Sequence, residues 1–148
     1  MSCSKTASSI RFREARERMK LSPEEAARRL CVSSSSLFQI ESDDDELASV
    51  HSAGDIQRFC QVLGIRPCDL FGIQSAAKPV SFVELAGAIT EHCQTRGVAI
   101  AEFEETTGWC VARSLQKPQR FLDDYSLTAI HDICRELGME WERFILGL

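Results

Sequence analysis

The chain has 148 residues, which is enough for one medium-sized domain or two small ones. Apolar residues make up 44% and charged residues 26%, as in an ordinary globular protein, and the net charge of −5 argues against a strongly basic, phosphate-binding surface. Because no apolar run has the length of a membrane span and the first residues lack the apolar core of a signal peptide, we expect a soluble, cytoplasmic protein.

The cysteines argue for a reducing compartment. Their number is odd and no two form a C-x-x-C pair, so neither a disulfide framework nor a metal site is expected. Most fall at positions that the helical pattern makes apolar, and we interpret them as buried, reduced thiols. The seven residues are Cys3, Cys31, Cys60, Cys68, Cys93, Cys110 and Cys134.

The chain is expected to begin with a loose arm of about eight residues, followed by a helix from about Ser9 to Met19. Ile10, Ala15 and Met19 can face inward. The rest of this helix carries dense positive charge, which could contact phosphates or pair with nearby glutamates. The basic residues are Arg11, Arg13, Arg16, Arg18 and Lys20.

Residues 21–41 predict two short helices joined by a tight turn. Ser22 can cap the first helix, Pro23 suits its first turn, and Glu25 stands at capping-box spacing. Ser33 can cap the second helix. The turn is assigned to Cys31 and Val32, and the inward residues are Ala26, Ala27, Leu30, Leu37 and Ile40.

Residues 41–51 form an acidic stretch without a clear period, and we expect a loop there. The apolar period of a helix returns from about Ala53 to Leu63, and Gly64 is a suitable helix stop. Pro67 then opens a short fifth helix, with Leu70 and Phe71 as its apolar residues.

This order of helices resembles the Xre-type helix-turn-helix domain of the Cro and phage-repressor family, over about residues 9–73. The spacing of the shared positions is more specific than any single residue. Such proteins place the second helix of the motif in the major groove of DNA, and they are commonly repressors, phage switches or antitoxins. The positions that carry the resemblance are Leu21, Ser22, Glu24–Ala27, Leu30, Val32, Ser33, Leu37, Ile40 and Glu41.

The second half of the chain repeats the apolar frame of the first. Residues 129–145 read AIHDICRELGMEWERFI, and residues 55–71 read DIQRFCQVLGIRPCDLF, with Cys60 matching Cys134 and Gly64 matching Gly138. Ser81 and Glu84 have capping-box spacing at the start of this second unit. Its turn would be Gly108–Trp109, and its third helix, within residues 110–117, matches the family poorly.

We therefore expect an all-α fold of two tandem five-helix, repressor-like units. Residues 9–73 form the first unit, residues 74–80 a linker, and residues 81–148 a second, divergent unit. One chain could then supply two DNA-binding units as an internal pseudo-dimer, although such proteins also form homodimers.

Two groups of residues are candidates for contacts with duplex DNA. The exposed start of the predicted recognition helix offers serines, which reach little and discriminate weakly, together with one glutamine. A small basic patch lies in or just after the third helix of the second unit. The candidates are Ser33, Ser34, Ser35, Ser36 and Gln39 in the first unit, and Arg113, Lys117 and Arg120 in the second.

Four adjacent carboxylates follow the recognition helix, where a DNA-reading relative would approach phosphate: Asp43, Asp44, Asp45 and Glu46. They would repel a phosphate backbone at short range. Either they form a solvated connector, or they form an acidic patch for a basic protein partner.

Two functions remain open at this point. The family resemblance implies a DNA-binding transcriptional regulator. The alternative is a non-catalytic protein-binding module on the same scaffold, such as an immunity protein or antitoxin that neutralises a basic toxin. An enzyme, a cofactor or a metal is not expected, since the three histidines are isolated in sequence and no glycine-rich phosphate loop occurs.

Overall fold

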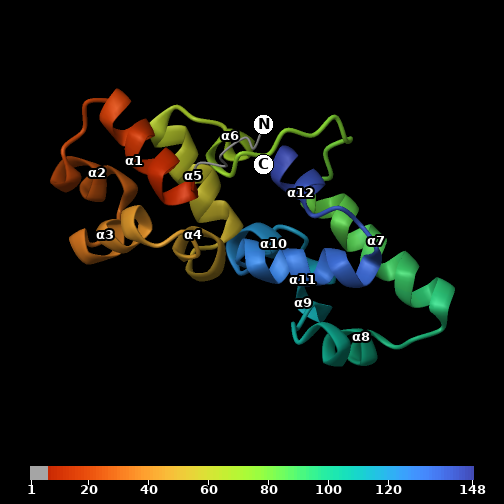
Figure 1. Ribbon diagram of the computed structural model, residues 1–148. Coiled ribbons are helices and arrows are strands. Elements are labelled where there is room, and N and C mark those ends of the chain that lie inside the picture. Colours follow the sequence, from red (N-terminus) through yellow and green to blue (C-terminus); the bar gives the residue numbers. More distant parts are fainter. Residues whose placement is uncertain (1–6) are drawn as a thin grey trace.

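The computed structural model describes residues 7–148, and the regular structure of this part of the chain is entirely α-helical (Figure 1). The first six residues, including Cys3 and most of the predicted arm, lie outside the described residues. The helices are α1 (Ser8–Arg18), α2 (Pro23–Leu30), α3 (Ser34–Ser42), α4 (Glu46–Val50), α5 (Ala53–Leu63), α6 (Pro67–Leu70), α7 (Phe82–Arg96), α8 (Ile100–Thr107), α9 (Ala112–Gln116), α10 (Arg120–Asp123), α11 (Leu127–Leu137) and α12 (Glu142–Leu146). Within residues 7–148, no helix combines the length and the apolar composition that a membrane crossing requires.

The first helix forms as predicted, but its inner face is rotated. Phe12 and Ala15 are completely buried, whereas Ile10 and Met19 are 36% and 44% exposed, so their predicted inward position is wrong. Phe12 sets the face, because its ring packs edge-on against Phe59 with the centroids 6.4 Å apart. The burial of this large aromatic side chain in the middle of α1, rather than that of the apolar residues near its ends, determines which face of the helix points inward.

The predicted acidic loop contains a helix. Helix α3 continues to Ser42, and α4 covers Glu46–Val50, so of residues 41–51 only 43–45 and His51 remain outside the helices. Leu47 explains the difference, since it is 1% exposed and anchors α4 in the core. Residues 7–73 therefore have six helices rather than the five predicted, and α10 is likewise an additional short helix in the second half.

The helix ends follow the local sequence signals. Gly64 and Gly138 end α5 and α11 in the left-handed conformation, with φ of 64° and 66°. Pro67 is the first residue of α6, as predicted. The predicted capping box of α7 is confirmed, because Ser81 accepts from the Glu84 N–H at 3.2 Å and the Glu84 carboxylate accepts from the Ser81 N–H.

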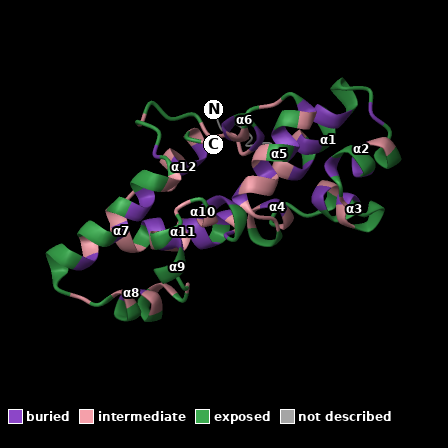
Figure 2. Cartoon of the chain, turned by 180° about the vertical axis from the view of Figure 1, so that it is seen from behind, coloured by how far each residue is buried: buried purple, intermediate pink, exposed green. Residues whose placement is uncertain are grey.

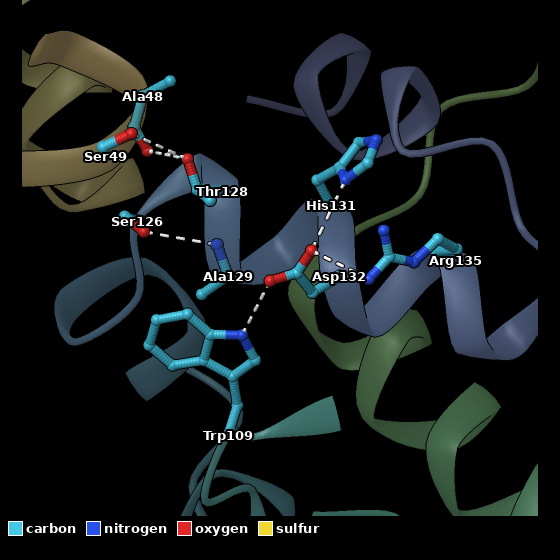
Figure 3. A network of polar contacts seen from close by, with 9 residues as sticks. All are labelled: Ala48, Ser49, Trp109, Ser126, Thr128, Ala129, His131, Asp132 and Arg135. Atoms are coloured by element: carbon cyan, nitrogen blue, oxygen red, sulfur yellow. Dashed lines mark hydrogen bonds and ion pairs between the residues drawn. The ribbon is translucent and has the colours of Figure 1, made fainter. Parts of the chain in front are cut away.

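The two halves of the molecule contact each other, and Figure 1 shows α4 and α5 next to α10 and α11. Helix α4 packs against α11, α5 against α10, and α6 against α12. The Ala53 N–H donates to the Tyr125 carbonyl at 2.8 Å, and Ser52 and Ser126 form an antiparallel bridge. Figure 3 shows the Thr128 hydroxyl on α11 reaching the Ala48 carbonyl of α4, at 3.1 Å.

The buried apolar residues form a core that draws on both halves of the chain. Figure 2 shows buried residues, in purple, on helices of both halves. Cys60, Cys68, Cys93 and Cys134 belong to this core, whereas Cys31 and Cys110 are exposed. Burial raises the pKa of Cys60 and Cys134 to about 12, so these two sulfur atoms are neutral thiols. The interpretation of the cysteines as buried small hydrophobes thus holds for four of the six described residues.

Gly54 permits the close contact between α5 and α10. A Cβ atom there would lie 3.0 Å from the backbone oxygen of Leu122. We therefore expect Gly54→Val to lower the free energy of unfolding by about 1–3 kcal/mol, as overpacking does, in urea denaturation.

Gly87 on α7 is the matched control, because a Cβ at that position meets nothing within 4 Å. Gly87→Ala should instead stabilise the protein by up to about 1 kcal/mol through helix propensity. Equal stabilities for Gly54→Val and wild type would contradict the close approach of α5 and α10.

Candidate nucleic-acid interface

Helices α2 and α3 form a helix-turn-helix, and local capping fixes the start of each. The Ser22 hydroxyl accepts from the Glu25 N–H at 3.1 Å, and Pro23 is the first residue of α2, both as predicted. The Glu25 carboxylate, however, accepts hydrogen bonds from Arg28 and Arg29. The predicted capping box of α2 is therefore replaced by one cap and a small ion-pair cluster.

The turn between the two helices is built on Cys31, whose φ of 56° lies in the left-handed region. The next N–H, of Val32, donates to the Ala27 carbonyl at 3.0 Å and closes the end of α2. Ser33 then starts α3, because its hydroxyl accepts from the Ser36 N–H at 3.0 Å. These bonds define the short turn, residues 31–33, that joins the two helices.

The inner face of the motif is confirmed. Leu30 and Ile40 are completely buried, and Leu37 is 2% exposed. Ala26 is also fully buried, and α2 packs against both α3 and α5. Their contact determines which side of α3 faces solvent.

A buried ion pair holds the far end of α3. The Arg16 guanidinium donates to the Glu41 carboxylate through Nε at 2.5 Å and Nη2 at 3.2 Å, and through Nη1 to the Leu21 carbonyl at 2.9 Å. The hydrogen bonds to Glu41 raise the pKa of Arg16 above its ordinary value. Arg16 was expected among the solvent-facing basic residues, but it joins α1, the start of α2 and the end of α3.

The outer face of α3 separates the predicted serines into two groups. Ser33 and Ser36 bond to each other, with a distance of 2.9 Å between their hydroxyl oxygens, and serve the cap. Ser34 and Ser35 are exposed at the start of the helix, and Gln39 is exposed one turn later. The helix can therefore offer Ser34, Ser35 and Gln39 to a nucleic acid.

Phe38 is the main residue of this face that sequence reasoning missed. Its side chain is 71% exposed, next to Gln39 on the surface of α3. The signal was available, because inward positions at 37 and 40 leave position 38 about 100° away around the helix. An aromatic residue exposed to this extent can contact the methyl group of thymine or a protein partner.

The predicted acidic patch is only partly free. Asp43 accepts from the Asp45 N–H at 2.9 Å, and the Asp44 carboxylate accepts from the hydroxyl of Ser9 on α1. All three aspartates remain exposed. Glu46 differs, because it is the first residue of α4 and its side chain is only 15% exposed. Its Oε1 atom lies 4.0 Å from Nε2 of His51.

The predicted basic patch of the second half lies on α9 and α10. Arg113 and Lys117 are exposed, on α9 and at its C-terminal end. Arg120 donates to Asp124 at 3.2 Å, so part of its charge is neutralised locally. Glu104 lies nearby, where its carboxylate accepts from the Ala112 N–H at 3.2 Å.

Each histidine packs edge-on against an aromatic ring. His51 contacts Phe59, His92 contacts Phe103, and His131 contacts Trp141, with ring centroids 5.3–5.7 Å apart. Within residues 7–148, no three histidine, cysteine or carboxylate side chains are grouped as metal ligands would be. These histidines are placed as packing residues.

Comparison with known proteins identifies one part of the chain. No curated protein and no solved structure matches the chain. A family model described as a helix-turn-helix domain matches residues 9–70, which covers α1 to α6 and ends before α7. Residues 9–70 are therefore a helix-turn-helix domain.

Proposed function

We propose that this protein is a DNA-binding transcriptional regulator whose helix α3 enters the major groove. The observation that carries the proposal is the helix-turn-helix match over residues 9–70, together with an outer face of α3 that no other helix covers in Figure 1. Helices of this motif commonly read base edges from the exposed side of their first turns. The role is one of binding, typical of non-catalytic proteins with this domain.

The exposed residues of α3 suggest how bases would be read. An amide such as that of Gln39 can bond an adenine edge through two hydrogen bonds, while Ser35 can bond a phosphate or a base. Phe38 can contact a thymine methyl group. Asp43 and Asp45 near the end of α3 oppose phosphate, so affinity would depend on base contacts and on basic residues elsewhere.

We also propose that α7–α12 are a second, divergent unit of the same kind, forming an internal pseudo-dimer with the first. The contacts between the halves are reciprocal, as an isologous interface requires: α4 meets α11, and α10 meets α5. Helix α6 meets α12, its counterpart in the order of elements. Ser52 and Ser126 cap equivalent helices and face one another.

In this arrangement α9 is the counterpart of α3. Helix α9 carries Arg113, and Lys117 follows at its end, so α9 would supply positive charge that α3 lacks. Helix α9 has five residues, whereas α3 has nine. We therefore assign base reading to α3 and phosphate contact to the second unit.

The protein-binding alternative is favoured by one observation, the exposure of Phe38. An exposed aromatic residue on α3, the helix that the run of aspartates follows in sequence, suits an interface with a basic protein, such as a toxin neutralised by an immunity protein or antitoxin. The two functions make opposite predictions for the aspartates.

The variant D43N/D44N/D45N separates these functions. Asparagine keeps the oxygen atoms that accept from the Asp45 N–H and from Ser9, so folding should be nearly unchanged. On the DNA-binding proposal, affinity for a random duplex at low salt should rise by roughly tenfold, because repulsion from phosphate is relieved. Fluorescence anisotropy with labelled duplex over a salt series measures it.

Base reading is tested with a duplex selected from a random pool by the full chain. Gln39→Ala should weaken binding to that duplex by about 1–3 kcal/mol, as loss of a paired base contact does. Gln61→Ala, at an exposed position of α5, is the matched control and should bind like wild type.

The regulator proposal fails if D43N/D44N/D45N gains no affinity for duplex DNA and captures a basic protein partner less well than wild type does.

A further inference from the structure

A second potential binding site lies in the C-terminal half, away from α3. A pocket of about 650 Å³ opens between the end of α8, the turn that follows it, α9 and α10. Ligand pockets in proteins typically measure about 300–1,000 Å³. Neither the helix-turn-helix match nor the proposed reading of DNA by α3 accounts for this pocket.

Two aromatic residues line the pocket, and hydrogen bonds hold both. The indole N–H of Trp109 donates to Asp132 on α11 at 3.1 Å (Figure 3). The Tyr125 hydroxyl donates to the Cys110 carbonyl and accepts from the Ser114 hydroxyl at 3.0 Å. Trp109 is half-buried and can offer ring surface to a ligand, whereas Tyr125 is only 7% exposed and supports the pocket from the core side. Because the Trp109 ring is held by its hydrogen bond, binding against it costs little side-chain entropy.

The formal charges of the side chains that line the pocket sum to zero, and Arg113 is the arginine among them without an ion-pair partner in residues 7–148. Arg120 is paired with Asp124 at 3.2 Å, and the Glu104 carboxylate accepts from a backbone N–H. Arg113 is exposed at the rim and makes no ion pair with any carboxylate of residues 7–148. A guanidinium binds a carboxylate through two parallel hydrogen bonds. The pocket thus combines an aromatic wall with one unpaired anion-binding group.

We propose that this pocket binds a small planar aromatic carboxylate, with the ring against Trp109 and the carboxylate on Arg113. The proposal does not depend on DNA binding by α3. If Arg113 also contacts phosphate, an occupied pocket would withdraw that charge from DNA and couple the ligand to the regulator.

Isothermal titration calorimetry of the full chain tests the proposal with three probes. 2-Naphthoate carries both the ring and the charge, 2-naphthalenemethanol carries the ring alone, and cyclohexanecarboxylate carries the charge alone. We expect saturable binding of 2-naphthoate with a Kd below about 1 mM, and affinities lower by about tenfold or more for the other two. Absence of saturable heat with 2-naphthoate would overturn the proposal.

Three variants locate the site. Arg113→Gln should weaken 2-naphthoate binding by about tenfold, because it removes the charge and keeps a polar side chain. Arg96→Gln, at the exposed end of α7, is the matched control and should bind like wild type. Ala112→Phe places a ring at the exposed lining position 112 and should abolish binding. Circular dichroism confirms folding, and an equal loss in Arg96→Gln would overturn the assignment.

Discussion

Glu41→Ala is expected to lower the free energy of unfolding by about 3 kcal/mol, at the low end of the range for removing one partner of a buried ion pair. The low end applies because the Glu41 side chain keeps 14% of its exposure. Without it, the buried Arg16 guanidinium retains the Leu21 carbonyl as its only hydrogen-bond acceptor within residues 7–148. Equilibrium denaturation in urea measures the loss.

Glu25 provides a matched control for this experiment. It also accepts from two arginines, Arg28 and Arg29, but that cluster lies at the surface, and Glu25→Ala should hardly change the midpoint. The double variant R16M/E41L should recover much of the stability lost in Glu41→Ala, because no uncompensated charge remains buried. A midpoint for Glu41→Ala equal to that of Glu25→Ala would mean that the pair contributes no more than a surface ion pair.

The helix-turn-helix could be predicted from the sequence because its signals are local. Ser22, Pro23 and Ser33 each act within three residues of their own position, so their roles can be derived without knowing the fold. Leu37 and Ile40 follow the helical period and are buried as expected. The same local logic predicted the ends of α5 and α11 at glycine.

The features that could not be predicted depend on distant partners. Arg16 and Glu41 stand 25 residues apart, and nothing in the sequence around Arg16 distinguishes it from its exposed basic neighbours. Helix α4 depends on Leu47 reaching the core, and its residues pack against α11 in the other half of the chain. The helical period of α3 predicts that the serines and Gln39 are exposed. The hydrogen bonds were needed to show which serines cap the helix and which remain free.

Leu30→Ala is expected to cost about 2–5 kcal/mol, because a completely buried leucine leaves a cavity that its neighbours fill only in part. Leu30 is the last residue of α2, and α2 packs against both α3 and α5. The cavity would therefore lie directly behind the turn that orients α3. Urea denaturation gives the loss, and a value well below about 1 kcal/mol would contradict the burial of this side chain.

Leu115 on α9 is a suitable comparison, since it is only half-buried against the core of the second half. Leu115→Ala should cost clearly less than Leu30→Ala, because part of its surface stays in water in the native protein. The two variants should also differ in function. With α3 loosened, Leu30→Ala should weaken binding to the selected duplex even where most of the protein is folded, whereas Leu115→Ala leaves the support of α3 intact. Equal DNA affinities for the two variants at a temperature where both are folded would show that α3 keeps its orientation without Leu30.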